Sequence, residues 1–84
     1  MAIASRLNEV MQKVRPEVAL PIIVEVTASP QQAEQSLRGM GMQVKYASKV
    51  LPLIYGSANS ALIQQIAKQG FVKEVSYDEP IFAL

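Results

Sequence analysis

Apolar residues near the start of the chain recur at intervals of three and four, as they do on one face of a helix. The residues with this spacing are Ile3, Leu7, Val10, Met11 and Val14. Pro16 ends the pattern, because proline has no amide hydrogen and disfavours helical backbone at the preceding residue. The spacing predicts a helix that either packs on the rest of the domain or binds a partner.

Four later segments have the composition and period of strands. They are predicted at residues 20–27, 42–47, 50–55 and 71–77. The first is rich in β-branched residues and apolar on both phases, which is typical of a central strand. In the second, Met42, Val44 and Tyr46 alternate with polar residues, and this predicts one buried face. Pro52 cannot donate to a ladder, so its part of the third segment is expected at a sheet edge or bulge.

Two further helices are predicted between these strands, at residues 30–39 and 59–69. Ser29 followed by Pro30 is a typical helix start, since the hydroxyl can accept from a backbone N–H and proline presets the first helical φ. Gly39 and Gly41 are expected to end that helix, because glycine readily adopts left-handed backbone. Either Ser57 or Asn59 is expected to cap the second helix.

The order after the first helix is therefore strand, helix, strand, strand, helix, strand. Two short halves of this kind predict a ferredoxin-like βαββαβ sandwich, an α+β fold with both helices on one face of a four-stranded antiparallel sheet. We expect a helical extension at residues 1–16 and an α+β domain at residues 20–84. The opposite sheet face is left bare, unless the first helix covers it.

Half of the 84 residues are apolar, which is a high share for so small a chain. A core of this size cannot bury all of them, so part of the apolar surface is expected to be exposed and to mark an interface. The alternative is a filled core with apolar residues scattered singly over the surface.

The charged and reactive residues exclude several functions. Eight basic and seven acidic residues give a net charge of +1 without a basic patch, which argues against nucleic acid as a partner. The chain has no cysteine and no histidine, so it offers no disulfide, no soft-metal site and no Cys/His catalytic pair. No carboxylate stands in a motif with a nucleophile. We therefore predict a protein that is not an enzyme and that needs no cofactor or metal.

The amino terminus has no basic region followed by a long apolar stretch. No apolar run approaches the roughly 18–20 residues that span a bilayer. These features predict a soluble, cytoplasmic protein without a membrane partner.

Three stretches of the chain resemble the subtilisin propeptide and peptidase inhibitor I9 family. Residues 21–26, Pro-Ile-Ile-Val-Glu-Val, are similar to its first strand. Residues 37–44 resemble its helix end, glycine turn and second strand. Residues 70–78 resemble its closing pattern of a Val, a second Val three residues later and an acid three residues after that. The resemblance covers about residues 20–84.

The resemblance implies a βαββαβ fold whose bare sheet face lies on two helices of a subtilisin-like serine protease. Carboxylates at the end of the last strand would cap the amino termini of those helices, where unpaired N–H groups and the helix dipole favour an anion. Because no catalytic domain follows, the resemblance implies a free-standing inhibitor or a folding chaperone that acts in trans.

The resemblance also implies a set of protease-binding residues at the end of the chain. They are Ser76, Asp78, Ile81, Phe82, Ala83 and Leu84. Asp78 matches the acidic position of the family, whereas Ser76 stands where a second acid is common. The tail would enter the active-site cleft like a cleaved product, with Leu84 in the first specificity pocket and Ile81 in the fourth. The alternative is a tail that packs on its own sheet or frays.

A second class of function fits the same residues. The chain could be a ferredoxin-like regulatory or assembly module that forms a homodimer or binds a small ligand through its bare sheet face. Removal of the last four residues separates the two interpretations, since an inhibitor would lose affinity and a sheet-mediated dimer would not.

Overall fold

The computed structural model describes residues 2–27 and 29–79. These residues form three helices and four strands. In chain order they are α1 (Ser5–Lys13), β1 (Leu20–Val26), α2 (Pro30–Met40), β2 (Gln43–Ala47), β3 (Leu53–Ala58), α3 (Ser60–Ala67) and β4 (Val72–Tyr77).

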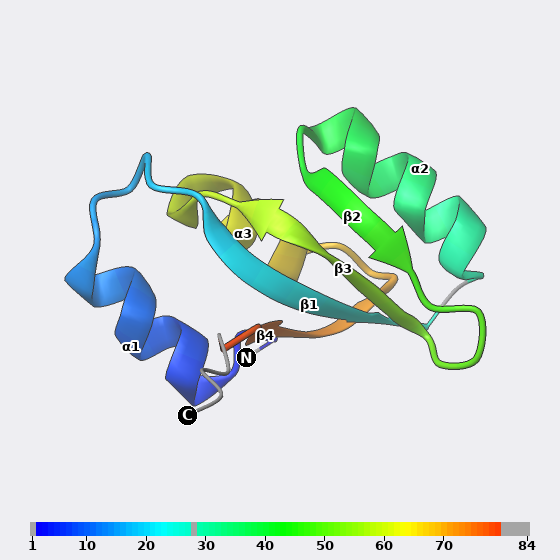
Figure 1. The fold of residues 1–84 in the computed structure, drawn as a ribbon, viewed down its shortest axis with the longest axis horizontal. Helices are drawn as coiled ribbons and strands as arrows, with labels where there is room; N and C mark the ends of the chain where they lie inside the picture. Colours follow the sequence, from blue (N-terminus) through cyan, green and yellow to red (C-terminus); the bar gives the residue numbers. More distant parts are fainter. Residues whose placement is uncertain (1, 28, 80–84) are drawn as a thin grey trace, which may run out of the picture.

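The four strands form one antiparallel sheet in the order β2-β3-β1-β4. In Figure 1, α3 lies behind the sheet, α2 runs alongside β2, and α1 lies at the β4 end of the molecule. The α+β class and the ferredoxin-like strand order predicted from the sequence are confirmed.

Strand β1 is the central strand that its composition predicts, because it pairs with β3 on one side and with β4 on the other. Its side chains alternate between buried and partly exposed positions along its whole length. The buried set faces α2 and α3 and consists of Leu20, Ile22, Val24 and Val26. The other set lies on the face without these helices, so the sheet has one covered and one uncovered face.

The prediction for the third strand is wrong by three residues. β3 begins at Leu53 rather than at residue 50, and Pro52 lies just before it. Proline has no amide hydrogen to donate, but its carbonyl can still accept. The Pro52 carbonyl accepts from the Val26 amide at 2.9 Å, which joins this turn to the end of β1.

Because β3 extends further along the chain than predicted, it also decides which residue caps α3. Ser57 belongs to the strand, so it is not the helix cap. Asn59 is the cap, since its Oδ1 accepts from the Leu62 amide at 2.9 Å. Gly56 lies inside β3, where a Cβ would come within 2.2 Å of the Gln43 carbonyl oxygen. Glycine is therefore required where β2 and β3 approach each other.

A bulge in β2 overturns the predicted alternation of that strand. Val44 pairs with Gly56 and Tyr46 pairs with Tyr55, so Lys45 is an extra residue without a partner position. One extra residue moves the following side chains to the opposite face of a sheet. Tyr46 is therefore 52% exposed on the uncovered face, although the sequence pattern placed it on the buried one.

Helix α2 begins and ends at the predicted residues within one position. Pro30 is in its first turn, but the Ser29 side chain makes no capping hydrogen bond to the described part of the chain. Gly41 ends the helix in left-handed backbone with φ 109°, and its amide donates to the Arg38 carbonyl at 3.0 Å. Most L-residues avoid this conformation, which explains the glycine.

The amino-terminal segment packs on the domain, in line with the first of its two predicted roles. The helix begins at Ser5, so Ile3 is not helical and instead forms a parallel bridge with Val75 of β4. Leu7 of α1 is fully buried, and Met11 lies next to α3. Because α1 lies at the β4 edge, no helix in residues 2–27 and 29–79 covers the sheet face opposite α2 and α3 (Figure 1).

Candidate functional site: the uncovered sheet face

The sheet face opposite α2 and α3 carries the candidate site, and we call it the open face. Strand register defines its members, because residues paired across an antiparallel sheet share a face. Ile23, for example, lies between Tyr55 and Ser76. By register and alternation, the open face consists of Pro21, Ile23, Glu25, Gln43, Tyr46, Leu53, Tyr55, Ser57, Glu74, Ser76 and Asp78.

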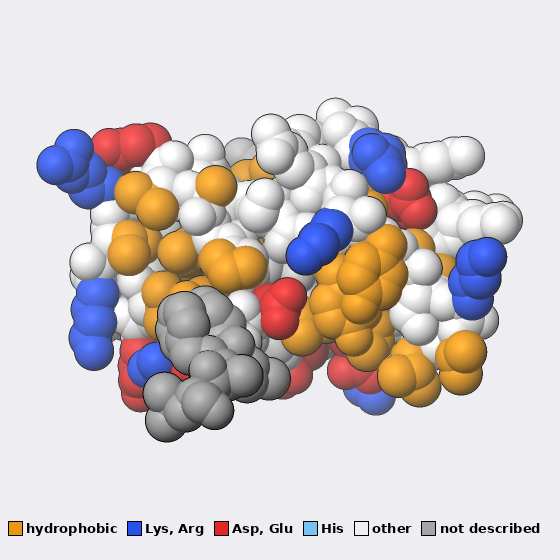
Figure 2. All heavy atoms as spheres, viewed as in Figure 1, with side chains coloured by type: hydrophobic (Ala, Val, Ile, Leu, Met, Phe, Trp, Pro, Cys, Tyr) orange, Lys and Arg blue, Asp and Glu red, His pale blue; other side chains and the backbone are white. Residues whose placement is uncertain are grey.

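Two stacked tyrosines form an aromatic pair on the β2–β3 side of the open face. The rings of Tyr46 and Tyr55, from neighbouring strands, have centroids 4.5 Å apart and planes inclined by 15°. Ile23 and Leu53 are partly exposed beside them. Figure 2 shows hydrophobic side chains gathered over this part of the sheet. Aromatic side chains supply a large contact area at low entropic cost, so the pair resembles the centre of a protein interface.

Carboxylates line the β4 side of the same face. Glu74 and Glu25 lie directly opposite each other on β4 and β1. The Ser76 hydroxyl donates to Glu74 Oε1 at 3.2 Å, and Lys73 Nζ lies 3.6 Å from Glu25 Oε2. Two acids at adjacent positions make this flank negative, although Lys73 partly offsets Glu25.

Asp78 adds a third acid at the end of this flank. Its amide donates to the Pro21 carbonyl at 3.0 Å, which fixes the backbone beside β1. Together with Gln43 and Ser57 it lines a shallow hollow of about 380 Å³. Partial burial raises the pKa of Tyr55, and the nearby Tyr46 and the Asp78 carboxylate raise it further. Of these causes, the Asp78 carboxylate is the smallest.

Two of the six predicted site residues, Ser76 and Asp78, lie together on the open face. The other four are the predicted tail residues 81–84, and they lie outside the described residues.

The prediction missed the aromatic pair and Glu74. A period of two counted back from Asp78 through Ser76 reaches Glu74, so the signal for this acid was present in the sequence. No comparable signal existed for Tyr46, because its position depends on the bulge in β2.

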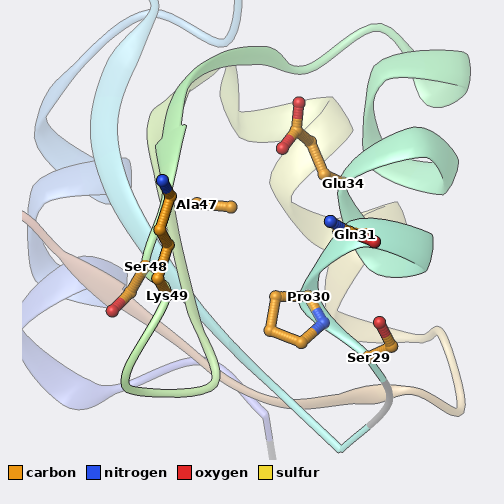
Figure 3. Close-up of a pocket in the computed structure, with 7 residues that line it drawn as sticks. All are labelled: Ser29, Pro30, Gln31, Glu34, Ala47, Ser48 and Lys49. Carbon is orange, nitrogen blue, oxygen red and sulfur yellow. The ribbon is translucent and has the colours of Figure 1, made fainter.

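A second hollow, of about 390 Å³, lies between the start of α2 and the residues that follow β2. Figure 3 shows lining residues from both sides, among them Ser29, Glu34, Ser48 and Lys49. The Glu34 carboxylate is already paired with Arg38 at 2.8 Å. The Ser29 and Ser48 hydroxyls therefore have no unpaired carboxylate in the lining that could take up their protons. This hollow does not have the nucleophile and base arrangement of a catalytic site.

The described residues form neither a metal-binding cluster nor a membrane-spanning helix. Among residues 2–27 and 29–79, no three His, Cys, Asp or Glu side chains are close enough together to hold a metal ion. In the same part of the chain, no helix has the length and apolar character that crossing a membrane requires.

No family model matches the chain, and no curated protein has a significantly similar sequence. The open face and the sequence resemblance described above are therefore the features that bear on function.

Proposed function

We propose that this chain binds a subtilisin-like serine protease through its open face and acts as its inhibitor or as a folding chaperone in trans. One observation carries the proposal: a stacked aromatic pair and a row of carboxylates share the open face. An exposed apolar centre of this kind suits a protein partner, and the acidic flank limits which partner fits.

The acidic flank fits a surface built from the amino termini of helices. Such termini carry unpaired N–H groups and about half a positive charge, and each accepts a carboxylate. Asp78 supplies one carboxylate at the position that the propeptide resemblance requires. Glu74, which is hydrogen-bonded to Ser76, supplies a second, so the missing acid at residue 76 has a substitute two residues away on the same face.

The proposal includes the tail. Residues 81–84 would follow the protease cleft as a product does, with Leu84 in the first specificity pocket and Ile81 in the fourth. Burial of one such side chain contributes about 1.5–3 kcal/mol. We expect the tail and the open face together to give low-micromolar or tighter inhibition, which is a binding free energy of roughly −8 kcal/mol.

Replacing Asp78 by Ala tests the acidic flank. We expect inhibition to weaken several-fold, because a carboxylate at a helix amino terminus contributes about 0.3–2 kcal/mol. The melting temperature should hardly change, since the Asp78 side chain has no salt bridge within residues 2–27 and 29–79.

The measurement for this variant is an inhibition constant paired with a thermal melt. Glu34→Ala is the matched control, because it removes an acid from the opposite side of the domain, where it pairs with Arg38. A large loss of stability in Asp78→Ala without any change in inhibition would show that its role is internal.

The runner-up function, an assembly or regulatory module, uses the same open face. In that case the stacked tyrosines would contact a second copy of the chain or a small ligand. Sedimentation of the chain without residues 81–84 separates the two functions. A dimer that persists after this truncation favours the module, and a monomer with weakened inhibition favours the inhibitor.

A further inference from the structure

The amino-terminal residues 2–13, which we call the N-terminal arm, are attached to the outer edge of β4. The Ala4 amide donates to the Val75 carbonyl at 2.9 Å, and the Val75 amide donates to the Ala2 carbonyl at 2.7 Å. The other edge of β4 pairs with β1. β4 is therefore held from both sides at Val75, two residues before its end.

The arm also contacts the chain beyond the end of β4. Arg6, in the first turn of α1, donates from its Nε to the Glu79 carboxylate. Its Nη1 lies 3.4 Å from Glu9 Oε2. One guanidinium thus connects the surface of α1 to the second residue after β4. The arrangement raises the pKa of Arg6, with the hydrogen bond to Glu79 as the largest cause.

Glu79 is the residue that precedes Pro80 in the sequence. A residue before proline is restricted to extended backbone by its contact with the proline ring. The backbone of Glu79 is restricted by its neighbour, and its side chain is held by Arg6. Together these restraints hold Glu79, the last described residue, by its backbone and by its side chain.

We infer that the N-terminal arm positions the carboxyl-terminal tail, with Arg6 and Glu79 as a pair of positioning residues. The inference rests on the proposed function, in which the tail enters a protease cleft. A tail that starts in a fixed direction loses less conformational entropy on binding, so it binds more tightly without any new contact to the partner. The N-terminal arm lies outside the βαββαβ unit, and positioning the tail would be its role in the domain.

A double-mutant cycle of Arg6→Gln, Glu79→Gln and both together tests the inference. Exposed ion pairs have small effects, so we expect each single variant to weaken inhibition by about two- to five-fold. The double variant should be no weaker than either single one, because both remove the same interaction. The charge swap Arg6→Glu with Glu79→Arg should recover most of the inhibition. Lys13→Gln is the control for loss of a positive charge on the same helix.

A second readout separates this inference from the proposed function. Backbone ¹⁵N relaxation of the free protein reports the order of Glu79 without any protease. We expect an order parameter near that of rigid backbone, about 0.85, in the wild type, and a fall towards about 0.6 in Arg6→Gln.

Each outcome of these two measurements decides one of the claims. If no protease is inhibited but Glu79 loosens in Arg6→Gln, the proposed function fails and the positioning role stands. Unchanged order at Glu79, or strictly additive losses of inhibition in the cycle, overturns the positioning role even if the wild type is a good inhibitor.

Discussion

Replacing Tyr46 and Tyr55 together by Ala is expected to weaken protease inhibition by at least about 30-fold, or about 2 kcal/mol. The two rings form the aromatic part of the open face, and Tyr46 is 52% exposed in the free domain. Central aromatic residues of an interface contribute most of its binding energy, and their truncation leaves partner groups without contacts.

The matched control for this pair is Tyr46→Phe with Tyr55→Phe. It keeps both rings and their stacking, so inhibition is expected to stay within about threefold of the wild type. A thermal melt of every variant shows whether the domain remains folded. An alanine pair that folds and inhibits as well as the wild type would show that the partner does not contact the open face.

Gly56→Ala is expected to destabilise the domain by about 3 kcal/mol. The added Cβ would lie 2.2 Å from the Gln43 carbonyl oxygen and 3.0 Å from the Val44 Cα, so backbone would have to move. Forced overpacking typically costs about 1–3 kcal/mol and occasionally more, out of a total of about 5–15 kcal/mol for a domain. The cost arises at the junction between β2 and β3, which also aligns Tyr46 with Tyr55.

Chemical denaturation of Gly56→Ala measures this effect, with Gly39→Ala as its control. Gly39 lies inside α2, and a Cβ there meets no described atom within 4 Å. Alanine is the better helix former, so Gly39→Ala is expected to gain up to about 1 kcal/mol. Equal stability of the two variants would contradict the close approach of β2 and β3.

The fold could be predicted from the sequence because local signals and global topology agree. The central position of β1 follows from its β-branched composition, and the end of α2 follows from Gly41. The start of β3 could not be read in the same way. Val50 and Leu51 are as apolar as the strand itself, yet they precede it and are exposed.

The candidate site was predicted only in part, for a different physical reason. Ser76 and Asp78 were predicted from the resemblance alone, in which Asp78 matches the acidic position and Ser76 stands where a second acid is common. Tyr46 was assigned to the wrong face because a bulge inserts Lys45, and a bulge depends on pairing with β3 rather than on local composition. The pairing of the arm with β4 is equally non-local, since it joins Ile3 to Val75.

A substitution in the tail tests whether the chain binds a protease cleft as a cleaved product does. Leu84→Asp is expected to cost at least about tenfold in affinity, because it places an unpaired charge in an apolar pocket. The substitution lies beyond β4, so the melting temperature should not change. Inhibition by this variant that equals the wild type would exclude the product-like mode of binding.

The inhibition constant of the wild-type chain against a panel of subtilisin-like serine proteases tests the central claim most directly. We expect at least one protease to be inhibited with a constant of about 1–10 μM or tighter, which corresponds to roughly −7 to −8 kcal/mol or more favourable. The inhibition should weaken in Asp78→Ala and collapse in the alanine pair at Tyr46 and Tyr55. Absence of inhibition across the panel at several tens of micromolar, on the order of −6 kcal/mol, would contradict the claim and favour the assembly module.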